Sequence, residues 1–257
     1  MWADPALRAA GLSFALPLLG ILLAHELGHW FACRRHRLRV TPPYFLPAPV
    51  GFGTFGAFLR IRSAIRDKRQ LVDVGVSGPI AGFVALLPFL VLGVARSEPV
   101  AVRVTSTLDD ALPWLYLPGE SLLERALVFA FHGNVGDRIL DPHPFLLAAW
   151  VGMFATMLNL LPLAQFDGGH LLYAAAGRRQ YRLAKPIWLA VALLGLVWPG
   201  WWLWCVVALV LGLRHPPLAD ESAPLGRSGR WGVAAGLVIF ALCFMPVPIR
   251  VVGLLGR

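Results

Sequence analysis

The sequence is poor in charged residues. Asp, Glu, Lys and Arg make up only 14% of its 257 residues, whereas 58% are hydrophobic and the mean hydropathy is +0.67. A soluble globular domain usually carries about 25% charged and about 45–50% apolar residues. These values exclude an ordinary soluble domain, and they predict an integral membrane protein.

Cysteine is also scarce. The three cysteines, Cys33, Cys205 and Cys243, are far apart in the sequence and form no paired motif. Without such a pair, neither a disulfide framework nor a thiolate zinc site is expected. We therefore interpret all three as small apolar side chains packed in the interior.

Long apolar runs are abundant. A spanning helix needs about 20 mostly apolar residues, and five stretches meet this condition: residues 10–33, 71–95, 144–163, 186–213 and 231–252. The fourth contains Trp198-Pro199-Gly200, which predicts a kink or a split and makes the expected number five to six. The predicted fold class is an all-α multi-pass transmembrane bundle, a single domain over residues 1–257 whose first span is retained rather than cleaved as a leader.

Charges are distributed unevenly between the apolar runs. The net charge is +9, and the segment between the first two runs carries nine basic residues and one acid, Asp67. The next segment, residues 96–143, is mainly acidic, and the short third one is basic. The positive-inside rule then places the N-terminus outside and the first and third loops in the cytoplasm. Because these basic clusters lie beside membrane segments, no nucleic-acid partner is expected.

The end of the first apolar run contains a His-Glu-x-x-His motif, formed by His25, Glu26 and His29. Residues four apart share one face of a helix, so the two imidazoles can bind one metal ion together. Glu26 could then act as a base toward water at that ion. Ionisable groups at membrane depth are costly and by default mark a functional site.

A catalytic zinc site usually has three protein ligands. The strongest candidate for the third is Asp167, because Pro162 should end the preceding helix and the following glycines allow the carboxylate to turn inward. His170 is a distant second candidate. His215 would lie at the far end of the fourth run, which this topology puts on the opposite face. The other rivals fall in loops: His36, Glu124, His132 and His143.

The first cytoplasmic loop contains alternating glycines and aromatic residues over residues 51–62. This composition predicts a small membrane-associated β-hairpin rather than a helix, and an extended peptide could add to its edge. At the start of the second apolar run, Gly78 and Gly82 have the small-x-x-x-small spacing that lets helices approach closely. We interpret these two glycines as packing residues.

Together, the two metal motifs resemble those of the site-2 protease family of intramembrane zinc metalloproteases (M50-type peptidases). The resemblance covers roughly residues 12–173 and rests on His25-Glu26-x-x-His29, Asn159-x-x-Pro162-x-x-x-x-Asp167-Gly168, Gly53-Thr-Phe-Gly56 and Ser77-Gly-Pro-Ile-Ala81. It implies that His25, His29 and Asp167 bind one Zn²⁺ per chain, and that Glu26 is the catalytic base. It also implies that Asn159 holds substrate or the developing oxyanion.

The resemblance further implies hydrolysis of a peptide bond within or near a transmembrane segment of a membrane protein, as in regulated intramembrane proteolysis. The residues that would contact the substrate are Gly53, Thr54, Phe55, Gly56, Asn159 and Pro162. The catalytic core would cover residues 10–173, with C-terminal spans over 186–252. Unlike many relatives, this chain is expected to have neither a PDZ nor a CBS domain. The expected partners are a transmembrane substrate and the lipid bilayer, and the expected location is a bacterial plasma membrane with the active site toward the cytoplasm, a plastid membrane being the alternative.

Two other functions are compatible with the same residues. A membrane metal-ion transporter could pass an ion between His and Asp side chains, but transport paths usually need polar groups along several spans, and the second, fourth and fifth runs offer almost none. An inactive scaffold could bind membrane segments without cutting them. The intact Glu26 argues against this second alternative. The sequence leaves the oligomeric state open.

Overall fold

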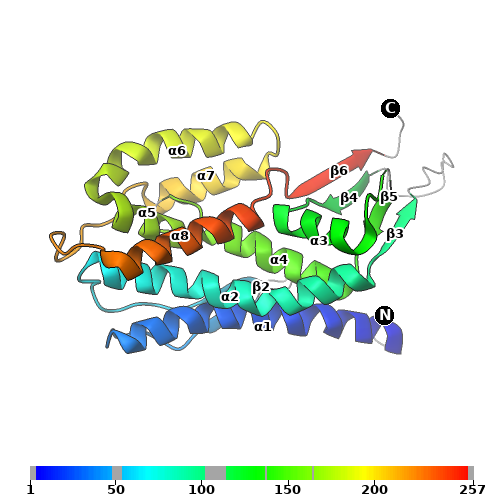
Figure 1. Ribbon diagram of the computed structural model, residues 1–257, viewed down its shortest axis with the longest axis horizontal. Coiled ribbons are helices and arrows are strands. Elements are labelled where there is room, and N and C mark those ends of the chain that lie inside the picture. Colours follow the sequence, from blue (N-terminus) through cyan, green and yellow to red (C-terminus); the bar gives the residue numbers. More distant parts are fainter. Residues whose placement is uncertain (1–3, 48–53, 102–113, 137, 164, 254–257) are drawn as a thin grey trace.

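The computed structural model is a bundle of helices with small strand pairs attached (Figure 1). It describes residues 4–47, 54–101, 114–136, 138–163 and 165–253. Its helices are α1 (Pro5–Arg35), α2 (Lys68–Arg96), α3 (Leu122–His132), α4 (Pro144–Asn159), α5 (Asp167–Ala176), α6 (Gln180–Leu194), α7 (Gly200–Leu211) and α8 (Gly226–Cys243), with a 3-10 turn at Gly177–Arg179. The mostly helical class is therefore confirmed.

Three antiparallel strand pairs accompany the described helices. β1 (Tyr44–Pro47) pairs with β2 (Thr54–Phe58), β3 (Glu98–Ala101) with β5 (Arg138–Asp141), and β4 (Trp114–Pro118) with β6 (Ile249–Gly253). The first pair confirms a hairpin in the first loop, but only β2 lies within the predicted residues 51–62, and β1 lies before them. The other two correct the all-α expectation, because each joins segments that are distant in the sequence and so leaves no local signal.

Two described helices are long and apolar enough to cross a membrane, α1 with 31 residues and α2 with 29. Both begin at an aspartate that caps the helix, since Asp4 accepts a hydrogen bond from the backbone of Ala6 and Asp67 from that of Gln70. α4 and α7 are shorter apolar helices of 16 and 12 residues. The expected count of five to six spans is not confirmed.

The fourth apolar run is split rather than continuous. α6 ends at Leu194 and α7 begins at Gly200, with Trp198 and Pro199 in the turn between them. The two helices lie side by side and run in opposite directions (Figure 1), so residues 186–213 do not form one span. The fifth run is also shorter than expected, because α8 ends at Cys243 and the chain then forms strand β6.

α2 lies at the centre of the bundle, in contact with α1, α4, α5 and α8. Its Leu71, Leu86 and Leu90 are fully buried and belong to the same hydrophobic core as Met153 and Met157 of α4. Such close packing stabilises the bundle through van der Waals contacts between the helices. The three cysteines, Cys33, Cys205 and Cys243, are free and buried, as the sequence predicted.

The segment between α2 and α4 contains a buried carboxyl group. Ser121 caps α3, because its hydroxyl accepts a hydrogen bond from the backbone N–H of Glu124. The carboxylate of Glu124 interacts in turn with the backbone of Ser121, and the two interactions together form a capping box. The Oε2 atom of Glu124 is buried without a hydrogen-bond partner. Burial, together with the nearby charge of Glu120, raises the pKa of Glu124 to about 8.

Candidate metal centre

Both histidines of the motif point from α1 toward the interior of the bundle. His25 and His29 are 6% and 8% exposed, and their rings meet edge to face with centroids 4.8 Å apart. Leu16 and Phe31 of the same helix are 64% and 62% exposed. The four-residue spacing therefore places the imidazoles on the one buried face of an otherwise apolar helix, as predicted.

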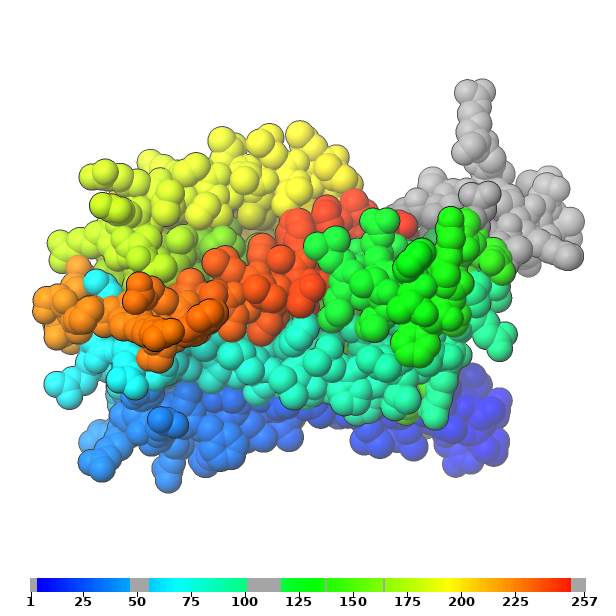
Figure 2. Space-filling view, viewed as in Figure 1, coloured from blue at the N-terminus to red at the C-terminus, as the bar shows by residue number. Residues whose placement is uncertain are grey.

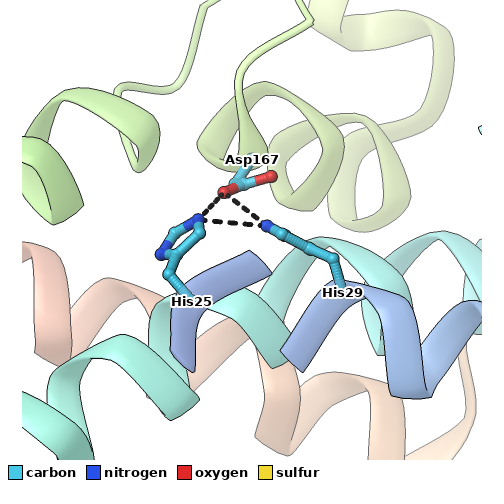
Figure 3. A group of neighbouring side chains, drawn as sticks. All are labelled: His25, His29 and Asp167. Carbon is cyan, nitrogen blue, oxygen red and sulfur yellow. Dashed lines mark hydrogen bonds and ion pairs between the residues drawn. The ribbon is translucent and has the colours of Figure 1, made fainter. Parts of the chain in front are cut away.

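Asp167 reaches the two histidines from the other side (Figure 3). α4 ends at Asn159, and the chain turns before Asp167 opens α5, where the positive end of the helix dipole favours a carboxylate. The tight turn requires Gly168, because a Cβ atom there would lie 2.0 Å from the carbonyl oxygen of Leu160. Pro162 lies within the turn, so its predicted role of ending the helix is confirmed.

The three side chains bring their ligand atoms into one small triangle. Nε2 of His25 lies 3.1 Å from Nε2 of His29, and Oδ2 of Asp167 lies 3.4 Å and 3.3 Å from these two nitrogens. In a tetrahedral zinc site with bonds of about 2.0–2.2 Å, two ligand atoms are about 3.3–3.6 Å apart. The triangle has nearly these dimensions, so the residues fit a zinc ion.

The hydrogen bonding of His29 supports the same conclusion. Its Nδ1 atom lies 2.7 Å from the carbonyl oxygen of Val74 on α2, which can only accept a hydrogen bond. Nδ1 therefore carries the hydrogen, and a neutral His29 presents the lone pair of Nε2 to His25 and Asp167. A backbone carbonyl that fixes a histidine in this way is typical of metal sites. Within the described residues, these three side chains form the one cluster able to hold a metal ion.

The two glycines interpreted as packing residues lie directly opposite the histidines. A Cβ atom at Gly78 would lie 2.1 Å from Nε2 of His29, and one at Gly82 would lie 3.1 Å from Cβ of His25. Gly78 thus leaves space for the His29 ring, and Gly82 leaves space beside His25. The sequence indicated close helix packing here, but it gave no signal that the packed groups are the metal ligands.

The metal cluster opens into a cavity of about 710 Å³. Its wall is mainly apolar and comes from α1, α4 and α7, including Leu18, Ile21, Leu22, Val151, Phe154 and Trp204. The polar side chains in the wall are few and include those of Glu26, Asn159 and Gln165. A mostly apolar cavity with few polar groups beside a metal cluster is typical of an active site.

Comparison with known proteins identifies the family. The family model for peptidase family M50 matches residues 13–197, which include both metal motifs. The chain belongs to peptidase family M50. No solved structure matches. The site-2 protease resemblance found in the sequence is therefore confirmed.

Curated relatives named as zinc metalloproteases match most of this chain. It is 30% identical to "Probable zinc metalloprotease EGY1, chloroplastic" of Arabidopsis thaliana over 93% of its own length. It is 31% identical to "Probable zinc metalloprotease EGY2, chloroplastic" of Oryza sativa subsp. japonica, again over 93% of its length. The matched region is 43% of each relative, so the chain spans less than half of their length.

Glu26 and Asn159, the other two residues implied by the M50 resemblance, both line the cavity. The carboxylate of Glu26 interacts with the backbone N–H of Leu59, directly after β2. Nδ2 of Asn159 lies 3.3 Å from Nε2 of His25. Asn159 is therefore next to a residue of the metal cluster, and Glu26 lines the same cavity.

The substrate-contacting residues expected from the resemblance are only partly placed. Gly56 lies in β2 with a positive φ of 115° and lines the cavity, as do the residues that follow it up to Leu59. Thr54 and Phe55 belong to β2, but their side chains lie outside the described part, and so does Gly53. Pro162 is not among the described residues of the cavity wall.

The expectation for His215 was wrong. Because α6 and α7 fold back on each other, the chain returns to the side of α5, and Nε2 of His215 lies 2.8 Å from Nδ1 of His170. Nδ1 of His215 faces the carbonyl oxygen of Pro216, so Nε2 is the accepting atom and His170 donates. Burial lowers the pKa of His170 to about 4, which keeps this ring neutral.

Proposed function

We propose that this chain is an intramembrane zinc metalloprotease that cuts a membrane protein substrate within or near a transmembrane segment, as in regulated intramembrane proteolysis. The observation that carries the proposal is the meeting of His25, His29 and Asp167 at the wall of the apolar cavity. The family and the zinc metalloprotease names of the relatives support the same reaction.

The shape and polarity of the cavity favour an apolar peptide as the substrate. Its volume of about 710 Å³ exceeds that of a single side chain, and most of its wall is aliphatic or aromatic. β2 borders it over residues 56–58, so an extended segment could lie alongside this strand. A helical peptide bond is shielded by its own turn, so the substrate has to unwind before it is cut.

The residues of the chain have separate roles in this proposal. Zinc, held by His25, His29 and Asp167, would polarise the scissile carbonyl and lower the pKa of water. The carboxylate of Glu26 takes a proton from the attacking water and later gives one to the leaving amine. The side-chain amide of Asn159 donates a hydrogen bond to the oxygen that becomes negative during attack.

The proposal is tested with Glu26→Gln, which keeps the shape of the side chain and removes the base. Purified Glu26→Gln should bind zinc like the unmodified chain and release no fragment from a co-expressed membrane protein. Glu98→Gln, an exposed site on β3, is the matched control and should retain full activity. Comparison of the membrane fragments released by the two variants would also identify substrates.

Full cleavage by Glu26→Gln would remove this residue from the mechanism. Zinc flux into proteoliposomes without any peptidase activity would support a transporter instead. A chain that binds no zinc would contradict both functions.

The membrane and its orientation are part of the proposal. α1 and α2 would cross the bilayer, with the segment between them, which carries most of the nine basic residues, on the cytoplasmic side. The relatives reported above carry chloroplastic names, which agrees with the plastid alternative, and the bacterial plasma membrane stays a proposal for this chain. Protease accessibility of the loop between α1 and β1 in sealed vesicles tests the orientation.

A further inference from the structure

A second pocket lies at the end of α1, outside the metal centre. It measures about 660 Å³ and is lined by Arg34, Leu38, Val40, Thr41, Pro42 and three further arginines, Arg37, Arg39 and Arg62. We call it the arginine pocket. Figure 2 shows the end of the molecule where the last turn of α1 (blue) lies near the start of α2 (cyan).

The backbone that carries these arginines is held in place by hydrogen bonds. The N–H of Arg62 donates to the carbonyl of Arg39 at 2.7 Å, and the N–H of Arg39 donates to Oγ of Ser63 at 2.9 Å. Val40 and Ile61 form a β-bridge, and both pack against a small core of Cys33, Leu38 and Val74. The pocket is therefore a built structure fixed to α1 and α2.

Arg37 occupies a position that normally favours glycine. Its φ is 55°, and it is the one described residue other than glycine with a positive φ. It follows the cap of α1 at His36, where glycine ends many helices because it tolerates this conformation without steric cost. An arginine here costs stability and puts a cationic residue in the lining of the pocket, which indicates a use for the side chain.

The charge of the arginine pocket is not balanced by the protein. Within the described residues, none of its four arginines forms an ion pair. The nearby Asp73 is 3.0 Å from Nε2 of His36 and is already paired. Arg60, Arg66, Lys68 and Arg69 add further positive charge at this end of the chain. Four cations around one pocket repel each other unless an anion lies among them.

The position of the pocket indicates where that anion comes from. Phe31, 62% exposed, is on the apolar surface of α1 just before the pocket begins, and Arg34 lies over the ring of Trp30 at 5.4 Å. Tryptophan and arginine at the end of an exposed apolar helix are typical of the boundary between membrane and water. At this depth the abundant anions are phospholipid headgroups.

We propose that the arginine pocket binds the phosphodiester of an anionic phospholipid headgroup. Arginine is suited to this role, because its planar guanidinium donates two parallel hydrogen bonds to phosphate oxygens. The pocket lies on the same antiparallel ribbon as β1 and β2, so a bound headgroup would also hold the base of the hairpin beside the cavity. The binding proposal rests on α1 crossing the membrane, not on peptidase activity.

The test uses the full chain in nanodiscs of phosphatidylcholine, with a fluorescent phosphatidylglycerol as the probe. Removing a basic residue near a membrane surface should weaken binding of the anionic probe about fivefold. Arg37→Gly should show this loss while the protein is at least as stable as before, since glycine suits the backbone at this position. Arg37→Gly with Arg62→Gln should weaken binding about 25-fold.

The matched control is the pair Arg179→Gln and Arg182→Gln, which removes the same charge from exposed sites outside the pocket. It should change binding less than twofold. An equal loss in this control would overturn the proposal, because the attraction would then be diffuse. Inorganic phosphate is the second probe: if it binds the pocket as tightly without lipid, the site takes a soluble anion and the lipid assignment is wrong.

Discussion

The substitution Gly78→Ala tests whether α2 shapes the metal centre. A Cβ atom at this position would lie 2.1 Å from Nε2, 2.4 Å from Cδ2 and 2.6 Å from Cε1 of His29, whereas ordinary contacts begin at 3.4 Å. The imidazole would have to retreat by about 1 Å or more, because protein interiors leave no spare space for a methyl group. The ring cannot retreat freely, since its Nδ1 is hydrogen-bonded to Val74 of the same helix.

This displacement is large for a metal ligand. Zinc–ligand distances hold to within about 0.2 Å, so a shift of about 1 Å removes His29 from the site. Losing only an outer hydrogen-bond partner of a ligand costs about 10–100-fold in metal affinity. We therefore expect Gly78→Ala to weaken zinc binding by at least about 100-fold and to abolish peptide cleavage with it.

Two matched glycines provide the controls. A Cβ atom at Gly82 would be 3.1 Å from Cβ of His25, so a shift of a few tenths of an ångström suffices and zinc affinity should fall less than about tenfold. Gly20 in α1 has nothing within 4 Å of such an atom, and alanine there should stabilise the helix by up to about 1 kcal/mol. Zinc content after gel filtration and competition with a chelator measure all three. A folded Gly78→Ala protein with unchanged zinc affinity would refute the reasoning.

Three further predictions concern other residues. Asn159→Ala should retain zinc and lower kcat about 10²–10³-fold in a cleavage assay, and an unchanged rate would exclude its role at the oxyanion. The pKa of Glu124 is raised from 4.5 to about 8 in the folded chain, so between these pH values the folded state holds a proton that the unfolded state has released. The free energy of unfolding therefore falls as the pH rises from 4.5 to 8. Glu124→Gln should therefore raise Tm at pH 8 more than at pH 5, and an equal effect at both values would contradict the burial argument. His215→Ala leaves the Nδ1–H of His170 without a partner and should lower the free energy of unfolding by about 1–3 kcal/mol, measured by denaturant titration, with zinc retained.

The parts of the site that the sequence predicted are those with a short-range pattern. The four-residue spacing of His25 and His29 fixes a shared helix face whatever the surroundings. Asp167 was predictable because a helix-ending proline and two glycines flank an acid at the end of an apolar run. The same is true of the hairpin, where prolines and glycines exclude a helix, and of the split at Pro199.

The parts that the sequence did not predict depend on chain paths between distant segments. β4 pairs with β6 although they are far apart in the sequence, and no local sequence pattern predicts this pairing. His215 was assigned to the wrong end because the sequence left a kink and a split at Pro199 as alternatives, and the structure has a full reversal between α6 and α7.

α2 organises the metal centre although none of the metal-cluster residues lies on it. The carbonyl of Val74 orients His29, and the missing side chain of Gly78 leaves space for its ring. A Cβ atom at Gly75 would lie 3.6 Å from the backbone oxygen of Asp167. One face of this helix therefore touches both halves of the site, which come from α1 and α5. Substitutions on that face should change zinc affinity without altering any ligand. Gly78 and Gly82, interpreted from the sequence as packing residues, therefore also serve the proposed chemistry.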